Sequence, residues 1–347
     1  MTPGHEEVAG TSDHPWAADG LPIVLPTGDA VRAFVASSGE PPDGVLGLLP
    51  PKWAPLTVEK LAANAVMAGC RADYMPLLLA AFKAMLDPAF NLYVVQTTTH
   101  PVTPFLLVGG PVADRLGIHG GAGAFGPGFR SNATIGRAVR LTLMNVGGCL
   151  PGDLDRSTQG HGGKWGACVS ENLEQVAWPA FHVEQGHAEG ESLVTVVGLD
   201  GLRNINDHVN GHPEGLMVTV ADAMSTMAIN TAYLPGPVGL FLSPEHAEIL
   251  ADAGWSRGDV RGYLYENARI DTRTARLGGM YDMHEWPRRF AASADSRVPV
   301  FQSVQDLLVF VVGGIGRHST FAASVGRSWP VTRPVPEASA DAGHSPI

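Results

Sequence analysis

Residues 119–132 read HGGAGAFGPGFRSN, and this glycine-rich stretch is the strongest single indication of how the chain folds. Its glycines are Gly120, Gly121, Gly123, Gly126 and Gly128. Because glycine has no Cβ, such a run lets the backbone turn tightly and approach a ligand closely. Apolar residues at helical spacing follow between Asn132 and Val146. The stretch therefore predicts a ligand-binding turn that opens a helix near Ser131.

Apolar runs on both sides of this turn alternate between helical and strand spacing. Helices are expected at 57–69, 74–86, 111–116, 132–146, 213–227, 244–253 and 257–269. Strands are expected at 91–96, 105–108, 193–199, 238–242 and 307–312. The order predicts an α/β fold with a mixed or parallel sheet flanked by helices. The proline-rich segment 41–55 is expected to be an extended lead-in, and the irregular segment 147–190 a working loop region.

The domain organisation follows from composition and from one short internal similarity. Residues 21–333 are expected to form a single α/β catalytic domain. Residues 1–20 and 334–347 are rich in small, acidic and proline residues and are expected to be disordered tails. LLVGG at 106–110 resembles VVGG at 311–314, so two similar intertwined halves, 45–150 and 190–330, are an alternative organisation.

Charge and hydropathy exclude several classes of protein. The 347 residues carry a net charge of −11 without a basic stripe, which argues against a nucleic-acid partner. No apolar run reaches the roughly 18–20 residues of a membrane span, and residues 1–20 lack the pattern of a secretion signal. A cytoplasmic protein is expected, and a homo-oligomer. Three cysteines do not make a disulfide framework, so each is either a working thiol or a small buried hydrophobe.

The glycine-rich turn has the features of an anion site. Successive backbone N–H groups, with the helix N-terminus behind them, would hold a carboxylate or phosphate, and Arg130 could pair with it. Ser131 and Asn132 complete the expected substrate-binding group. The turn lacks the Lys-Ser/Thr of a P-loop and the spacing of a dinucleotide fingerprint, so a small anion is a better match than a nucleotide. The alternative is a structural turn with Ser131 as the helix N-cap.

A second segment, 158–168, carries three reactive side chains among glycines. His161 could transfer protons, and Lys164 would lower the pKa of the Cys168 thiol and so favour its thiolate. The alternative is a solvated loop with one buried cysteine. Cys70 is expected at the C-terminal end of a helix, where the dipole raises a thiol pKa and disfavours a nucleophilic role.

Three further places hold histidines. If 182–184 is a strand, His182 and Glu184 share one face and could bind a divalent metal with residues such as His187; structural histidines are the alternative. His208 follows Asp207, a weak sign of acid–base chemistry. The glycine turn after the strand at 307–312 carries Arg317 and His318, and it is expected to face the same cleft as residues 120–128. No cofactor is firmly implied.

Five longer motifs resemble those of an uncharacterised bacterial family that is often encoded beside small proteins with a UGSC (selenocysteine or cysteine) motif. They are NAVMAGC at 64–70, QTTTHP at 96–101, FGPG at 125–128, NATIGRA at 132–138 and NVGG at 145–148. The resemblance covers roughly residues 45–330, and it implies a small partner protein bearing a thiol or selenol. It supplies no reaction. His119 and Cys149 depart from the family pattern, which puts a catalytic role for either in doubt.

Three functions remain as hypotheses. The first is a lyase or hydratase acting on a small carboxylate, with His161, Lys164, Cys168 or His208 in catalysis. The second is a thiol-dependent redox or sulfur-transfer enzyme that uses Cys168 and works with a small partner. The third is a non-catalytic subunit that binds and stabilises a partner.

Overall fold

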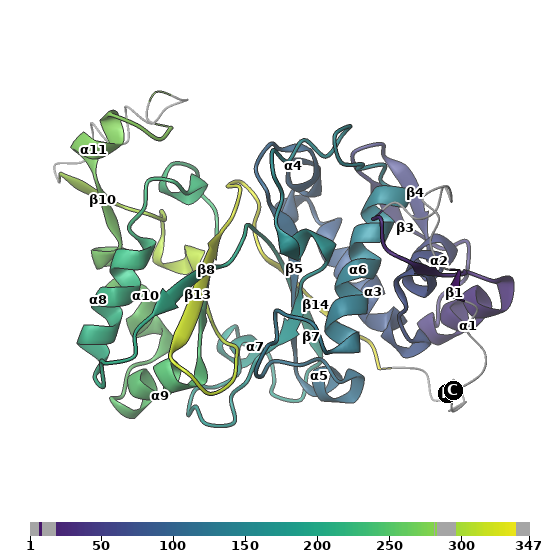
Figure 1. Ribbon diagram of the computed structural model, residues 1–347. Helices are drawn as coiled ribbons and strands as arrows, with labels where there is room; N and C mark the ends of the chain where they lie inside the picture. Colours follow the sequence, from purple (N-terminus) through teal and green to yellow (C-terminus); the bar gives the residue numbers. More distant parts are fainter. Residues whose placement is uncertain (1–6, 9–18, 281, 283–295, 338–347) are drawn as a thin grey trace.

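The structure is a computed structural model, and it describes residues 7–8, 19–280, 282 and 296–337. Its centre is two four-stranded sheets that lie face to face, with helices on the two outer sides (Figure 1). The first sheet has the order β14 (Val331–Pro334), β7 (Leu193–Leu199), β5 (Thr103–Gly109), β6 (Cys168–Ser170). The second has the order β12 (Leu307–Val311), β9 (Val238–Leu242), β13 (His318–Ala323), β8 (Arg203–Asn206).

Each sheet is mixed, with one parallel pair. In the first sheet only β5 and β6 run parallel, and in the second only β12 and β9 do. The expected mixed α/β architecture is therefore confirmed. The 190–330 segment also contributes β7, which pairs along its whole length with β5 of the first sheet. The two sheets are thus intertwined along the chain rather than built from separate halves.

Helices lie on the outer side of the first sheet, some of them against its strands and others against neighbouring helices. These are α1 (Gly28–Ser38), α2 (Val58–Ala68), α3 (Met75–Met85) and α6 (Arg130–Asn145), with the short α4 (Leu92–Thr97) and α5 (Pro111–Leu116) nearby. Their apolar faces share one core with β5 and β7. α2 begins at the N-cap Thr57 and ends at Gly69 in the left-handed conformation, as its sequence predicts.

The second sheet has its own helical layer and core. The layer comprises α8 (Pro213–Met224), α9 (Pro244–Asp252) and α10 (Arg257–Asn267), drawn in green in Figure 1. Smaller elements complete the chain: α7 (Phe181–Glu184), α11 (Thr272–Arg276), and the antiparallel pairs β1 (Glu7–Val8) with β2 (Ile23–Val24), β3 (Val45–Leu49) with β4 (Ala54–Thr57), and β10 (Arg269–Asp271) with β11 (Arg297–Pro299). Single 3₁₀ turns lie at Ala72–Tyr74, Pro88–Phe90, Gly162–Trp165, Asn230–Ala232 and Val304–Asp306.

A third, smaller apolar cluster holds the two sheets together. Aromatic side chains from both inner faces meet there, with ring centres 5.4 Å apart for Phe105 and Phe241 and 5.3 Å apart for Phe241 and Phe310. Such aromatic contacts bury large apolar areas and stabilise a sheet-on-sheet interface.

Several local predictions are wrong. Residues 92–97 form helix α4 rather than a strand, since a short apolar run carries no reliable period. Residues 41–55 include the strand β3 and the start of β4, which pair as a hairpin. The first tail is partly ordered: Glu7–Val8 pairs with β2, and Asp19 binds Arg137 at 2.6 Å. The second tail begins later than 334, because Pro334 ends β14 and Val335 is buried. The rest of both tails lies outside the described residues.

Within the described ranges, no single helix is long and apolar enough to cross a membrane. Only the bent helical pair Ala72–Met85 and Pro88–Thr97 reaches the required length and composition when taken together.

Candidate functional site

The two glycine-rich turns meet at one end of the interface between the sheets. The N–H of Gly313 donates to the carbonyl of Gly120 at 2.8 Å, and the Asn172 side chain donates to the carbonyl of Gly313, also at 2.8 Å. A Cβ added to Gly314 would lie 2.5 Å from the Cβ of Ala122, so the contact requires glycine. The expectation that residues 313–319 share a cleft with residues 120–128 agrees with this contact.

A cavity of about 180 Å³ opens where these turns meet. Its lining combines turn backbone, aromatic rings and two polar side chains, from Gly123, Ala124, Phe125, Gly126, Phe241, Val312, Gly313, His318 and Thr320. The cavity is smaller than the roughly 300–1,000 Å³ of pockets for drug-sized ligands, so it suits a molecule of a few heavy atoms. Among the described residues, no lysine or arginine lines it.

The glycine turn is held in place by the helix that follows it. Asn132 on α6 accepts from the N–H of His119 at 2.8 Å and donates to the carbonyl of the same residue at 2.8 Å. Ser131 donates to the carbonyl of Gly117, and Phe129, not Ser131, is the N-cap residue of α6. Ser131 and Asn132 are both buried, so the structure gives them a supporting position behind the turn.

Arg130 points away from the cavity. Its Nε donates to the carbonyl of Gly69 at 3.1 Å, at the end of α2. The glycine backbone of the predicted anion site thus lies at the cavity. Arg130, the cation expected from the sequence to pair with the anion, does not.

Two histidines 110 residues apart meet beside the cavity, and His318 is the one that lines it. The Nε2 atoms of His208 and His318 lie 3.1 Å apart, and Nδ1 of His318 lies 3.0 Å from Oδ1 of Asn204. The antiparallel pairing of β13 with β8 brings Asn204 and His318 to this place. Since an amide oxygen only accepts, Nδ1 of His318 carries the proton in the neutral ring, and its Nε2 is the acceptor in the contact with His208.

The side chain of Arg317 is engaged in hydrogen bonds and an ion pair that connect two loops. Its Nη1 donates to the carbonyls of His208 and Asn210 at 3.2 and 3.1 Å, and its Nε pairs with Glu245 at 3.2 Å. Glu245 also accepts from the N–H of Gly316 at 2.8 Å. The arginine therefore fixes the loop of His208 against the loop of His318, and Glu245 neutralises its charge.

The loop after β8 begins with Asp207, a side chain that is equally fixed. Burial disfavours the charge of Asp207, but hydrogen bonds from Asn210 and Thr219 outweigh it and hold the pKa of this carboxyl below its usual range. Asp207 is therefore occupied by loop contacts. Behind it, His246 lies 2.8 Å from Ser319 Oγ and 3.0 Å from the Asp207 carbonyl, and burial lowers its pKa.

The other predicted catalytic segment lies around different partners. Lys164 Nζ binds Asp155 at 2.8 Å, and burial beside Arg140 lowers the pKa of the lysine. His161 accepts from the N–H of Gly163 at 3.1 Å, and burial lowers its pKa. Neither side chain lines the cavity. The structure therefore does not join this segment to the glycine turns as the sequence hypothesis required.

The three cysteines are all buried, and their thiols favour the protonated form. Burial raises the pKa of Cys70 to about 12 and that of Cys149 to about 11, and it also raises the pKa of Cys168. Lys164 has no part in the shift of Cys168, which lies 2% exposed in the core on β6. The reading of Cys168 as a small buried hydrophobe fits this environment, and thiolate chemistry does not.

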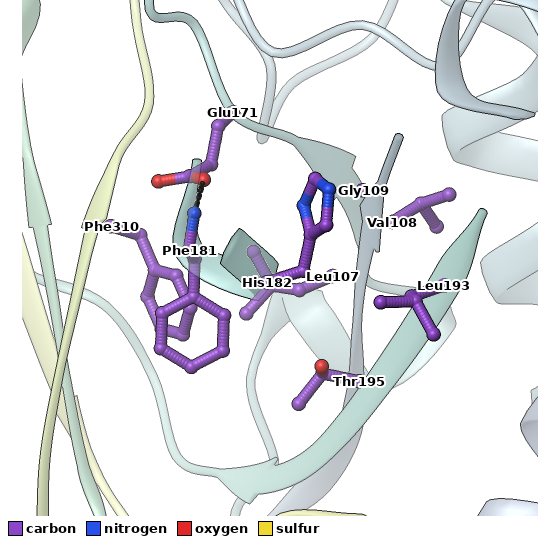
Figure 2. A pocket seen from close by; sticks show the side chains of 9 residues that line it. All are labelled: Leu107, Val108, Gly109, Glu171, Phe181, His182, Leu193, Thr195 and Phe310. Carbon is purple, nitrogen blue, oxygen red and sulfur yellow. Dashed lines mark hydrogen bonds between the residues drawn. The ribbon is translucent and has the colours of Figure 1, made fainter. Parts of the chain in front are cut away.

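A second, much smaller cavity lies at the C-terminal end of β5. Figure 2 shows His182 and Glu171 among its apolar lining, with a hydrogen bond from the Phe181 N–H to the Glu171 carboxylate at 2.6 Å. Gly109 lies so close to His182 that an added Cβ would come within 2.7 Å of Nδ1. The space, about 20 Å³, is that of a single water.

The predicted metal pair does not converge on this cavity. His182 and Glu184 lie on helix α7, not on a strand, so their side chains do not share the expected face. Glu184 pairs with Arg261 and lies 3.6 Å from Arg257. His182 Nε2 is 3.4 Å from the carbonyl of Glu189. In the described part of the chain, no group of three or more His, Cys, Asp or Glu side chains is arranged to hold a metal ion.

Sequence reasoning missed four of the residues that shape the main cavity: Asn204, Thr320, Phe125 and Phe241. Asn204 and Thr320 lie on strands β8 and β13, which were not predicted because short polar strands have no clear alternation. Phe125 packs against Phe105 and Phe241, with ring centres 5.6 and 5.2 Å away. In the sequence, the one indication of a binding role among these four residues was the position of Phe125, an aromatic residue within a glycine-rich turn.

Comparisons with known proteins give no match: no family model, no curated protein and no solved structure is significantly similar to this chain.

Proposed function

We propose that the chain is an enzyme of the lyase or hydratase type that moves a proton on a small polar metabolite in the cavity between the glycine turns. The observation that carries the proposal is the placement of His318. It lines the cavity, it is oriented by Asn204 at 3.0 Å, and its Nε2 lies 3.1 Å from that of His208.

The imidazole pair supplies the acid–base group. Histidine is the side chain that gains and loses a proton between about pH 5 and 8. In an elimination, Nε2 of His318 takes a proton from a substrate carbon, the C–H electron pair forms a double bond, and the leaving group departs. His208 is in contact and exposed, so the proton passes through it to solvent. Hydration is the reverse sequence.

Binding comes from the remaining lining. The hydroxyl of Thr320 is buried and has no hydrogen-bond partner among the described residues, so it is free to bond a substrate oxygen. The backbone of Gly123 lies at the cavity for the anionic end, whereas the N–H of Gly126 already donates to the Gly123 carbonyl at 2.7 Å. Phe125 with Phe241 covers an apolar part. A compact carboxylate with a hydroxyl or a double bond fits this set.

The test is proton exchange at carbon. The purified protein is incubated in D2O with a panel of small hydroxy and unsaturated carboxylates, and deuterium incorporation is followed by mass spectrometry. Incorporation with at least one compound is expected, and His318→Asn should lower its rate by about 10²–10⁴-fold. His187→Asn is the matched control, because His187 is also partly exposed but pairs with Glu191. Full exchange in His318→Asn would refute the role of this ring.

A further inference from the structure

The geometry of the same histidine pair points to a second capacity. We propose that His208 and His318 chelate a divalent transition-metal ion, such as Zn²⁺, through their Nε2 atoms. The proposal uses the site of the proposed function but does not depend on its chemistry.

The separation of the two nitrogens matches that of two ligands on one ion. Ligand nitrogens about 2.0–2.1 Å from zinc lie about 2.9 Å apart at a right angle and about 3.3 Å apart at the tetrahedral angle. The Nε2 atoms of His208 and His318 are 3.1 Å apart, between these two values.

The ring orientation is compatible with chelation as well as with the hydrogen bond between the two rings. A straight N–H···N bond of this length would place the ring centres about 5.4 Å apart, because each Nε2 lies about 1.15 Å from its ring centre. The ring centres are 4.9 Å apart, with 75° between the ring planes. At least one ring is therefore inclined to the line that joins the two nitrogens, as the rings are when both face a common ion.

The hydrogen bond with Asn204 orients the His318 ring as a metal ligand. Asn204 accepts at Nδ1 of His318 and so leaves Nε2 unprotonated, which is the outer hydrogen bond that metal-bound histidines usually make. Both rings are exposed and reachable from solvent. The nearest cation, Arg317, is paired with Glu245, so its charge repels an ion less.

Two protein ligands leave the other coordination positions to water or to a small anion. In the described residues no third His, Cys, Asp or Glu joins the pair. Imidazole nitrogen favours Zn²⁺, Ni²⁺ and Cu²⁺, whereas Mg²⁺ favours oxygen ligands, and this difference gives the experiment an internal control.

The experiment is a calorimetric titration of the chelator-treated full chain with Zn²⁺ alone, and separately with Mg²⁺. We expect one saturable Zn²⁺ site, a loss of affinity of at least tenfold in His208→Asn and in His318→Asn, and no Mg²⁺ binding at this pair. His187→Asn should keep the wild-type affinity. Absence of a Zn²⁺ site, or wild-type affinity in both histidine variants, would overturn the proposal.

A measurement on the unaltered protein covers the case in which a variant fails to fold. The ring-proton NMR signals of His208 and His318 should broaden first when Cu²⁺ is added in small amounts, and broadening that spares both rings would also overturn the proposal. The two proposals can fail separately. Deuterium exchange that survives His318→Asn ends the proposed reaction only, and an absent Zn²⁺ site ends the metal site only.

Discussion

The backbone N–H of Gly313 donates a hydrogen bond of 2.8 Å to the carbonyl of Gly120, although the two residues lie in turns that belong to different sheets. This bond joins the turn after β12 to the turn before α6. It closes one side of the cavity that His318 and Thr320 line. The candidate site is therefore a product of the contact between the two sheets, and its integrity depends on residues that keep the turns close.

Gly314→Ala should separate the two turns. The new Cβ would lie 2.5 Å from the Ala122 Cβ and 2.9 Å from its Cα, so backbone has to move. We expect a loss of about 1–3 kcal/mol in the free energy of unfolding, measured by denaturant titration, as for other overpacked sites. Gly211→Ala is the control, because nothing lies within 4 Å of its added Cβ. Equal stability of the two variants would contradict the tight contact.

Thr320→Val should weaken the function of the cavity without unfolding the chain. Valine keeps the shape of the side chain but removes the hydroxyl that has no partner in the described structure. We expect kcat/KM for the exchanging substrate to fall about tenfold, the effect of one lost hydrogen bond of roughly 1.4 kcal/mol. Thr320→Ser retains the hydroxyl and should stay within about threefold of the wild type. A valine variant as active as the wild type would exclude the hydroxyl from substrate binding.

Glu171→Ala should be the most destabilising of these changes. Glu171 binds Arg257 at 2.7 Å and accepts from the N–H groups of Phe181 and Val311, so it ties α10, α7 and β12 together. Removing Glu171 leaves the buried Arg257 with only its longer contact to Glu184 at 3.6 Å, so a cost near the lower end of the about 3–5 kcal/mol for a broken buried pair is expected.

Glu171→Gln is the matched variant for this pair, because its amide oxygen can still accept from the backbone. A smaller loss in the free energy of unfolding is expected for it than for Glu171→Ala. If alanine and glutamine cost the same, the backbone hydrogen bonds contribute little and the charge pair alone matters.

The cysteines should be inert in the native protein. Because burial raises their pKa values, to about 12 for Cys70 and about 11 for Cys149, almost no thiolate is present at pH 8. Labelling with a thiol reagent should be slow until denaturant is added and should then reach three thiols per chain. Cys168→Ala should retain the deuterium exchange rate within about twofold, with a stability loss of about 1 kcal/mol from the vacated space. Rapid labelling of native Cys168 would reopen the thiol hypothesis.

Stability should fall as the pH is lowered below about 6.5. Burial lowers the pKa values of His100, His161 and His246 in the folded chain. As the pH falls, the unfolded chain therefore binds protons at these three histidines before the folded chain does. This stabilisation is complete above the unfolded pKa of about 6.5 and is lost progressively as the pH falls toward the folded pKa values.

The measurement is the free energy of unfolding at pH 7.5, 6.5 and 5.5. His161→Gln should flatten the profile, because a neutral side chain takes up no proton in either state. A slope that is the same in His161→Gln and the wild type would show that this ring does not contribute.

The amino-acid sequence by itself determined the regular elements whose signals are local. Thr57 and Gly69 bound helix α2 because a capping hydroxyl and a left-handed glycine act within one turn of the chain. The buried strands at Leu193–Leu199 and Val238–Leu242 follow from continuous runs of apolar residues. The glycine turn before α6 could be predicted because glycine permits tight turns of the local backbone.

Only the tertiary structure decided which side chains share a site. Asn204, His208, His318 and Thr320 come together because β13 pairs with β8, a register that depends on contacts across more than 100 residues. The same packing moved Arg130 onto Gly69, buried Cys168 in the core and engaged Lys164 with Asp155. Residue types and spacing carry the chemistry that each side chain can perform, but burial and strand pairing fix its partners, and those depend on the whole fold.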